Sequence, residues 1–138
     1  MQLEQLMLHL PFTITNLYAD FAEAKGIMRL ERDHLILEFQ TQDTVLGLLK
    51  SNIKQESIAL DDLHSVIFKK KFFKGELIIK AKRMHALGNI PGSEQGEIKL
   101  IIARKDKEAA AQFAVEMELM ISEHKLKKLD EEADDFSA

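Results

Sequence analysis

The basic residues of this sequence are its clearest candidates for binding a ligand. Residues 69–83 hold seven basic side chains and one acid, although the 138-residue chain has a formal net charge of -4. Ammonium groups clustered beside aromatic rings can attract phosphates, either on a membrane surface or along a nucleic acid. This candidate site for an anionic ligand consists of Lys69, Lys70, Lys71, Lys74, Lys80, Lys82 and Arg83.

The same basic run also has a structural explanation. If these residues form a strand, alternation sends Lys69 and Lys71 to one face and Lys70 to the other. Phe68 and Phe72 would then enter the core. Lysine is also a common device for keeping an edge strand from pairing with another chain. We favour this structural interpretation. A charge run alone is weak evidence for nucleic-acid binding, so we do not expect a nucleic-acid partner.

No group of residues fits a common catalytic or metal-binding arrangement. The pair Asp61 and Asp62, followed by His64, fits a bend between two strands better than a metal site. The loop at residues 88–96 lacks the Gly-Lys-Ser/Thr ending of a phosphate loop, and Ser93 lacks the second glycine of a nucleophile elbow. The histidines show no close paired spacing suited to zinc: His9, His34, His64, His85 and His124. We therefore expect no enzyme activity, catalytic residues, metal or cofactor.

The elements that would position these residues are mostly β-strands. A hairpin is predicted over residues 28–40, because apolar and polar residues alternate on both sides of a turn at Asp33. Next come a strand at residues 57–60, the acidic bend, a strand at 64–73, a Lys74-Gly75 turn and a strand at 76–83. After the loop at residues 88–96, residues 97–104 are predicted to form another strand.

Other segments give weaker patterns. The spacing of Leu3, Leu6, Met7 and Leu10 predicts a short amphipathic helix, which Pro11 would end. Residues 12–18 show β-type alternation, whereas residues 18–25 fit either a helix or a strand. Residues 41–52 fit either a helical turn or a covering loop.

A helical run from Lys105 onward carries apolar residues on two opposite sides. At about 100° of rotation per residue, one side collects Ala110, Phe113, Ala114, Met117, Met120, Ile121 and His124, which can pack on a β-core. The other side collects Val115, Leu119, Leu126 and Leu129, with Ser122 among them. A helix that serves one core needs only one apolar stripe, so the second stripe predicts a partner surface.

Composition indicates one globular domain in residues 1–129, followed by an acidic, flexible tail at residues 130–138. Apolar residues make up 46% and charged residues 30%, as in ordinary globular proteins. The chain has no cysteine, which excludes disulfides and thiolate metal sites. The first residues lack the pattern of a signal peptide, and no apolar run approaches the roughly 20 residues of a membrane span. We therefore expect a cytoplasmic protein without a transmembrane segment.

The segment from Ser57 to Ile67, with its strand, acidic bend and second strand, resembles part of the pleckstrin-homology-like (PH/GRAM-type) domains. A later strand, a loop, a further strand and the closing helix follow in the same order, so the resemblance covers about residues 22–128. It implies a seven-strand, orthogonally packed β-sandwich or partly open barrel capped by one long α-helix. It also implies a binding or scaffolding role, like that of the bacterial members of this family. Lipid-binding members usually concentrate basic residues in the first hairpin loop, where this chain has Arg32, Asp33 and His34.

Together these patterns predict a non-catalytic scaffolding module that binds itself or another protein. Association would use the α-helix stripe Val115, Leu119, Leu126 and Leu129, with the outer strand positions Ile27, Ile36, Ile78 and Ile101. The alternative is binding of an anionic ligand, either a membrane lipid headgroup or a nucleic acid, by the basic hairpin at residues 69–83, with a weak contact to anionic lipid as one form of it. An enzyme of unknown type is the third possibility.

Overall fold

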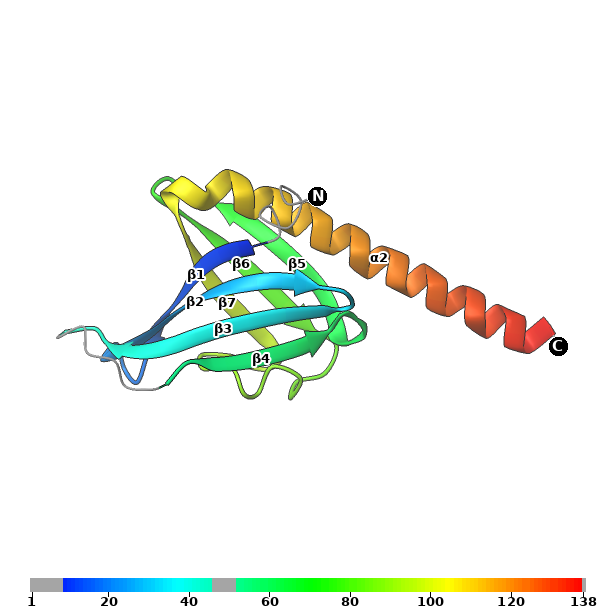
Figure 1. The fold of residues 1–138 in the computed structure, drawn as a ribbon, viewed down its shortest axis with the longest axis horizontal. Coiled ribbons are helices and arrows are strands. Elements are labelled where there is room, and N and C mark those ends of the chain that lie inside the picture. The colour runs from blue at the N-terminus through cyan, green and yellow to red at the C-terminus, as the bar shows by residue number, and fades with distance from the viewer. Residues whose placement is uncertain (1–8, 46–51, 138) are drawn as a thin grey trace.

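A computed structural model of the protein describes residues 9–45 and 52–137. Within them, antiparallel strands lead into one long C-terminal helix (Figure 1). The strands are β1 (His9–Leu17), β2 (Ala22–Glu31), β3 (His34–Asp43), β4 (Lys54–Ala59), β5 (Leu63–Lys70), β6 (Lys74–Ala81) and β7 (Glu97–Ala103). Two 3-10 turns, η1 (Leu60–Asp62) and η2 (Arg104–Asp106), precede β5 and the helix α2 (Lys107–Ser137) respectively. The predicted class, a mostly β fold of seven strands with a long C-terminal helix, is confirmed.

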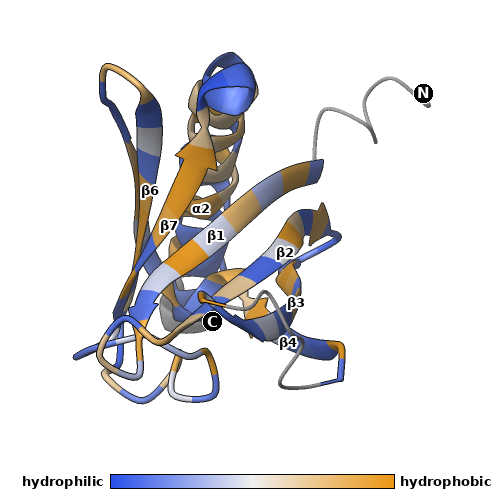
Figure 2. Cartoon of the chain, turned by 90° about the vertical axis from the view of Figure 1, so that its left-hand side faces the viewer, coloured by the Kyte–Doolittle hydropathy of each residue, from blue (hydrophilic) through white to orange (hydrophobic). Residues whose placement is uncertain are grey.

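The described strands form one antiparallel sheet that bends around the core without closing. Their order is β4-β3-β2-β1-β7-β6-β5, so β4 and β5 are the two edges. The sheet bends at its middle, where β1 pairs with β2 on one side and with β7 on the other. Figure 2 shows β6 and β7 on one side of the bend and β2 to β4 on the other, with α2 behind the opening between them.

Strand β1 illustrates how every second side chain of a strand packs into the core. Leu10, Phe12 and Ile14 are buried, and His9 and Pro11 alternate with them at the surface. The colours of β1 in Figure 2 alternate between hydrophobic and less hydrophobic residues along the strand. The N-terminal helix predicted up to Leu10 is therefore wrong at its end. His9 and Leu10 belong to a strand, because the alternation that begins at Leu10 continues into the core. The rest of that prediction lies outside the described residues.

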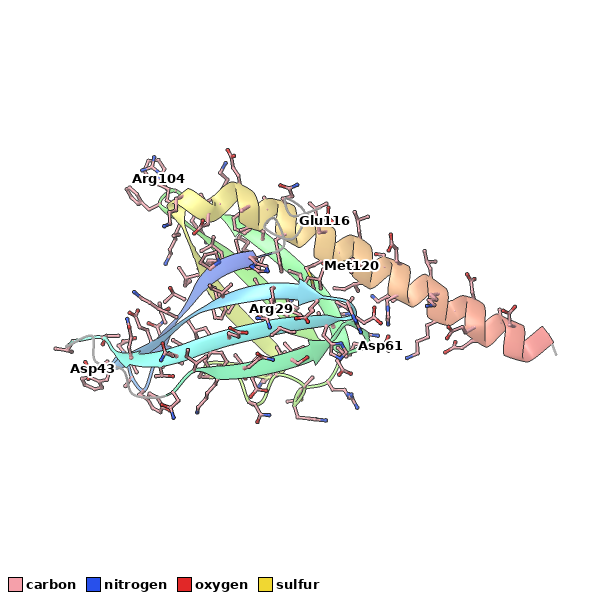
Figure 3. All side chains as sticks on the ribbon, in the orientation of Figure 1. Arg29, Asp43, Asp61, Arg104, Glu116 and Met120 are labelled. Carbon is pink, nitrogen blue, oxygen red and sulfur yellow. The ribbon has the colours of Figure 1, made fainter. Side chains whose placement is uncertain are left out.

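Helix α2 covers the opening of the sheet with one of its two apolar sides. Phe113, Met117 and Ile121 on this side are buried, and the helix contacts β5, β6 and η1. Figure 3 marks the course of this segment from Arg104 past Glu116 and Met120, and the last turns project beyond the sheet. The backbone stays helical to Ser137, through the acidic residues for which the sequence predicts a flexible tail.

Two details of the β5–β6 hairpin differ from the sequence predictions. Lys74 and Gly75 begin β6 and pair with β7, so residues 71–73 make the turn instead. The sequence predicts Phe72 in the core, but Phe72 is 81% exposed because it lies in that turn and not within a strand.

Fewer apolar side chains are exposed on the outer faces of the strands than the sequence predicts. Ile27 is 48% exposed and Ile101 is partly exposed, but Ile36 and Ile78 are buried. Ile78 lies between Ile67 of β5 and Lys99 of β7 in the register of the sheet. Two of the four predicted strand positions are therefore buried within the chain, whereas all four predicted α2 positions are exposed.

Candidate interaction sites

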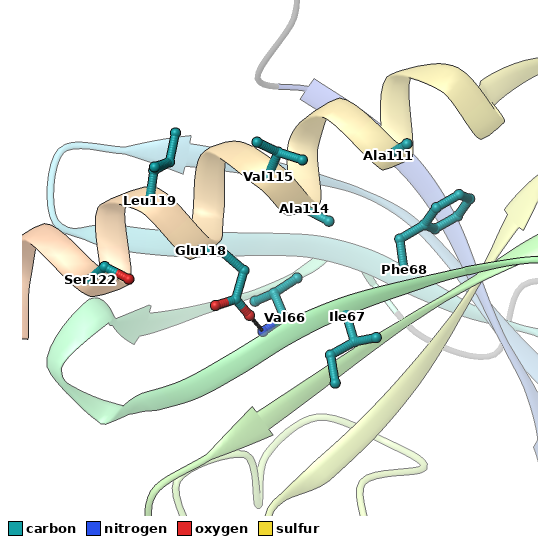
Figure 4. Close-up of a pocket in the computed structure, with 9 residues that line it drawn as sticks. All are labelled: Val66, Ile67, Phe68, Ala111, Ala114, Val115, Glu118, Leu119 and Ser122. Carbon is teal, nitrogen blue, oxygen red and sulfur yellow. Dashed lines mark hydrogen bonds between the residues drawn. The ribbon is translucent and has the colours of Figure 1, made fainter.

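An apolar groove of about 640 Å³ lies between the edge strand β5 and helix α2. Among the described strands, β5 pairs only with β6, so its outer edge is left for this groove. Figure 4 shows Phe68 pointing from β5 toward the helix, with Val115 and Leu119 on the outer side of α2. The groove is lined by Val66, Ile67, Phe68, Ala111, Ala114, Val115, Glu118, Leu119 and Ser122.

The predicted second stripe of α2 borders this groove and continues past it. Its four large apolar side chains are all more than half exposed: Val115 59%, Leu119 54%, Leu126 62% and Leu129 59%. With Ser122 they form what we call the α2 stripe, on the side opposite the buried Phe113 and Met117. Successive members are separated by four, three, four and three residues, which is the spacing of a coiled-coil seam.

A polar contact fixes α2 over the edge of β5. The backbone N–H of Val66 donates a hydrogen bond to Glu118 Oε1 at 2.7 Å. No other strand of the described residues lies on this edge of β5, so the carboxylate supplies the acceptor that the buried backbone group needs. Sequence reasoning missed Glu118, because an acidic residue between two apolar stripes has no distinguishing feature until the strand edge beside it is known.

Replacing Glu118 with alanine should lower the free energy of unfolding by about 1–3 kcal/mol, because the Val66 amide then loses its acceptor. Urea denaturation of the purified protein measures this loss. Glu116→Ala removes an exposed carboxylate two residues away, and its effect should stay within about 0.5 kcal/mol. Equal losses in the two variants would mean that the contact with Val66 adds nothing specific.

The seven basic residues predicted as one site are divided between the two ends of β6. Lys69, Lys70, Lys71 and Lys74 surround the β5–β6 turn, whereas Lys80, Lys82 and Arg83 lie at or beyond the far end of the strand. There Arg83 pairs with Asp62 at 2.8 Å. Lys80 lies six positions after Lys74 along the strand, which corresponds to roughly 20 Å. In Figure 3, the labelled Arg104 lies near the end of β6 that carries the turn, and the labelled Asp61 lies near the opposite end.

The end that carries the turn, residues 69–74, combines charge with exposed aromatic rings, and we call it the β5–β6 tip. Phe72 is 81% and Phe73 70% exposed, and their rings pack edge to face with centroids 4.6 Å apart. Lys74 pairs with Ala103, so the exposed Arg104 and Lys105 of η2 follow directly beside the tip.

Lys107, in the first turn of α2, connects the helix to the tip. Its Nζ donates hydrogen bonds to the backbone carbonyl oxygens of Lys71 and Phe72, the latter at 2.7 Å. Loss of hydration lowers the pKa of Lys107 below the usual lysine value, and the charges of Arg104 and Lys70 lower it further. Sequence reasoning missed Arg104, Lys105 and Lys107 as members of this cluster, because about 30 residues separate them from the hairpin.

Two of the remaining polar candidates, His124 and Asp61, are partners of each other. His124 Nε2 lies 3.0 Å from Asp61 Oδ1, so this pair joins α2 to the bend that the sequence predicts at Asp61 and Asp62. Among the described residues, no three His, Cys, Asp or Glu side chains are grouped so that they could hold a metal ion. In the same part of the chain, no helix combines the length and the apolar character needed to cross a membrane.

Searches of protein-family models, curated proteins and solved structures gave no match to this chain. The resemblance to PH-like domains therefore stays a prediction. The groove, the α2 stripe and the β5–β6 tip are the features from which a function can be inferred.

Proposed function

We propose that this protein is a non-catalytic, PH-like interaction module that associates with a second copy of itself through the α2 stripe. The observation that carries the proposal is a row of four large, exposed apolar side chains on a helix whose opposite side already fills the core. Extended apolar surface of this kind on a folded chain is typical of an interface. Pairing of two stripes would remove this surface from water.

A second copy suits the stripe because of its heptad spacing. Leu119 and Leu126 take the a positions of the heptad, and Val115, Ser122 and Leu129 take the d positions. Two such helices can interlock their a and d side chains along one seam. The buried side of α2 is turned toward its own sheet, so the two sheets would lie on the outside of the pair.

The charges beside the stripe favour parallel helices. In a parallel pair, Lys125 at a g position faces Asp130 of the partner subunit at the following e position, which brings opposite charges together. In an antiparallel pair, e positions face e positions, and here these are Glu116, Glu123 and Asp130, all acidic. Glu118, an acidic g residue, already accepts the hydrogen bond from Val66 and is turned toward the sheet.

The groove widens the apolar surface beyond the stripe. Phe68 of β5 and Ala114 of α2 line the groove next to Val115 and Leu119. A pair with two-fold symmetry would bury this same patch on both copies. The proposed interface therefore includes the stripe as its centre and the mouth of the groove as its margin.

Light scattering after size exclusion tests the proposal on the full chain. The wild-type protein should have the mass of an oligomer, with its apolar seam making it persist in high salt. The variant Leu119→Glu, Leu126→Glu places two carboxylates in the seam and should have the mass of a monomer, with an unchanged circular dichroism spectrum.

Lys127→Glu is the matched control, because this single exposed substitution changes the net charge by the same two units away from the stripe. It should leave the oligomer intact. A wild-type protein that remains monomeric at the highest attainable concentration would contradict the proposal. So would equal dissociation of both variants.

A further inference from the structure

The β5–β6 tip combines exposed aromatic rings with exposed cationic side chains. Phe72 and Phe73 form a protruding apolar pair at the apex of the hairpin. Around residues 69–76 and 104–108 stand seven cationic side chains and three acidic ones, although the whole chain is net negative. From this arrangement we propose that the tip docks on an anionic phospholipid membrane, with Phe72 and Phe73 entering the headgroup region and the surrounding cations contacting lipid phosphates.

The aromatic pair is suited to the membrane interface. Two phenyl rings at the end of a hairpin have no interior of their own to enter, and both remain more than two-thirds exposed. Aromatic and aliphatic side chains of peripheral proteins bury in the boundary between headgroups and acyl chains, while Lys and Arg stay among the headgroups. Insertion of the tip would remove Phe72 and Phe73 from water without any change in the fold.

The cations of the tip remain available for phosphate. Lys69, Lys70 and Lys74 are exposed, as are Arg104 and Lys105 of η2. Glu76, the acid nearest to the turn in β6, is shared between Lys71 at 3.7 Å and Lys99 at 3.9 Å. The local field at the tip is therefore positive, and an anionic bilayer attracts such a cluster in proportion to its number of Lys and Arg residues.

The tip is held in shape before any ligand binds. Lys107 Nζ bonds the carbonyl oxygens of Lys71 and Phe72, and the Lys71 N–H bonds the Lys74 carbonyl oxygen at 2.8 Å. The start of α2 thus braces the turn that presents both rings. A braced loop loses less conformational entropy on docking than a flexible one.

The shape of the tip favours a membrane over a nucleic acid. Sites for single-stranded nucleic acid combine a positively charged groove with separate aromatic platforms on which bases stack. Here the rings of Phe72 and Phe73 pack against each other edge to face, at the apex of a hairpin.

The tip and the α2 stripe also use different residues, so docking on a membrane and self-association can be tested separately.

Co-sedimentation with vesicles tests the inference. Wild-type protein should pellet with vesicles of phosphatidylcholine and phosphatidylserine, release as salt is raised, and stay in solution with phosphatidylcholine alone. Phe72→Ser, Phe73→Ser should weaken binding by about tenfold or more, because the inserted rings are lost. Lys70→Gln, Lys74→Gln should also weaken it, by about thirtyfold, because each lysine near an anionic surface contributes about 1 kcal/mol.

Lys80→Gln, Lys82→Gln removes the same charge at the other end of β6 and should change binding less than twofold. The dissociating variant Leu119→Glu, Leu126→Glu should still bind through its single tip, which separates this inference from the proposed self-association. Thermal unfolding confirms that each variant is folded. The inference is overturned if the wild type does not bind anionic vesicles, or if the Lys80→Gln, Lys82→Gln control loses as much binding as the tip variants. It is also overturned if the protein binds a single-stranded oligonucleotide and no vesicle.

Discussion

Phe113→Ala should lower the free energy of unfolding by about 3–5 kcal/mol, the largest loss expected from a single truncation in α2. Phe113 is 1% exposed and belongs to the cluster that joins α2 to the sheet. Its removal leaves a cavity that the rigid strands below cannot fill by collapse. Urea denaturation followed by circular dichroism measures the loss.

Val115→Ala supplies the matched comparison two residues along the same helix. Val115 is 59% exposed, so its truncation should change the free energy of unfolding by no more than about 0.5 kcal/mol. Both substitutions are best made in the dissociated Leu119→Glu, Leu126→Glu background, where association does not contribute to stability. A large loss with Val115→Ala in that background would show that the stripe packs within its own chain, against the proposed function.

Gly26→Ala should destabilise the fold by about 3 kcal/mol or more, because the added methyl group has no room. A Cβ at Gly26 would lie 1.9 Å from the carbonyl oxygen of Glu38 and 2.8 Å from Cβ of Phe39. The first of these atoms is backbone in the paired strand β3, so no side-chain rotation can relieve the overlap. The β2–β3 pairing itself must shift.

Gly88→Ala is the control for this substitution. Its Cβ would lie 3.2 Å from the nearest atom, the His85 carbonyl oxygen, which a small loop adjustment can accommodate. The effect of Gly88→Ala should stay within about 1 kcal/mol. If thermal unfolding gives the two variants the same midpoint, the close approach of β2 and β3 at Gly26 is not a constraint on the fold.

The strands and the helix could largely be predicted from the sequence, because their signal is local. Alternating apolar residues predict the hairpin that the structure shows as β2 and β3, and the breaker residues predict the loop before β7. The failure at the N-terminus has a local cause as well. Leu10 belongs to two competing patterns, a helical one with Leu6 and Met7 and an alternating one with Phe12 and Ile14, and the sheet selects the second.

The candidate sites could be predicted only in part. The two sides of α2 follow from the helical period, so the sequence identifies the stripe residues that the structure leaves exposed. The basic site, in contrast, needed the tertiary structure. Lys80, Lys82 and Arg83 are close in sequence to the turn but lie at the opposite end of a strand, while Arg104, Lys105 and Lys107 join the tip from a distant segment.

By itself, the sequence determined what repeats at short range: the strands, the two-sided helix and the positive charge of the β5–β6 hairpin. The tertiary structure decided which ends of these elements meet, and so brought Glu118 to the free edge of β5 and placed Phe72 at an exposed apex. The physical reason is that the periods of helices and strands are set by local backbone geometry. The meeting of distant segments depends on how the whole sheet bends to bury one shared core.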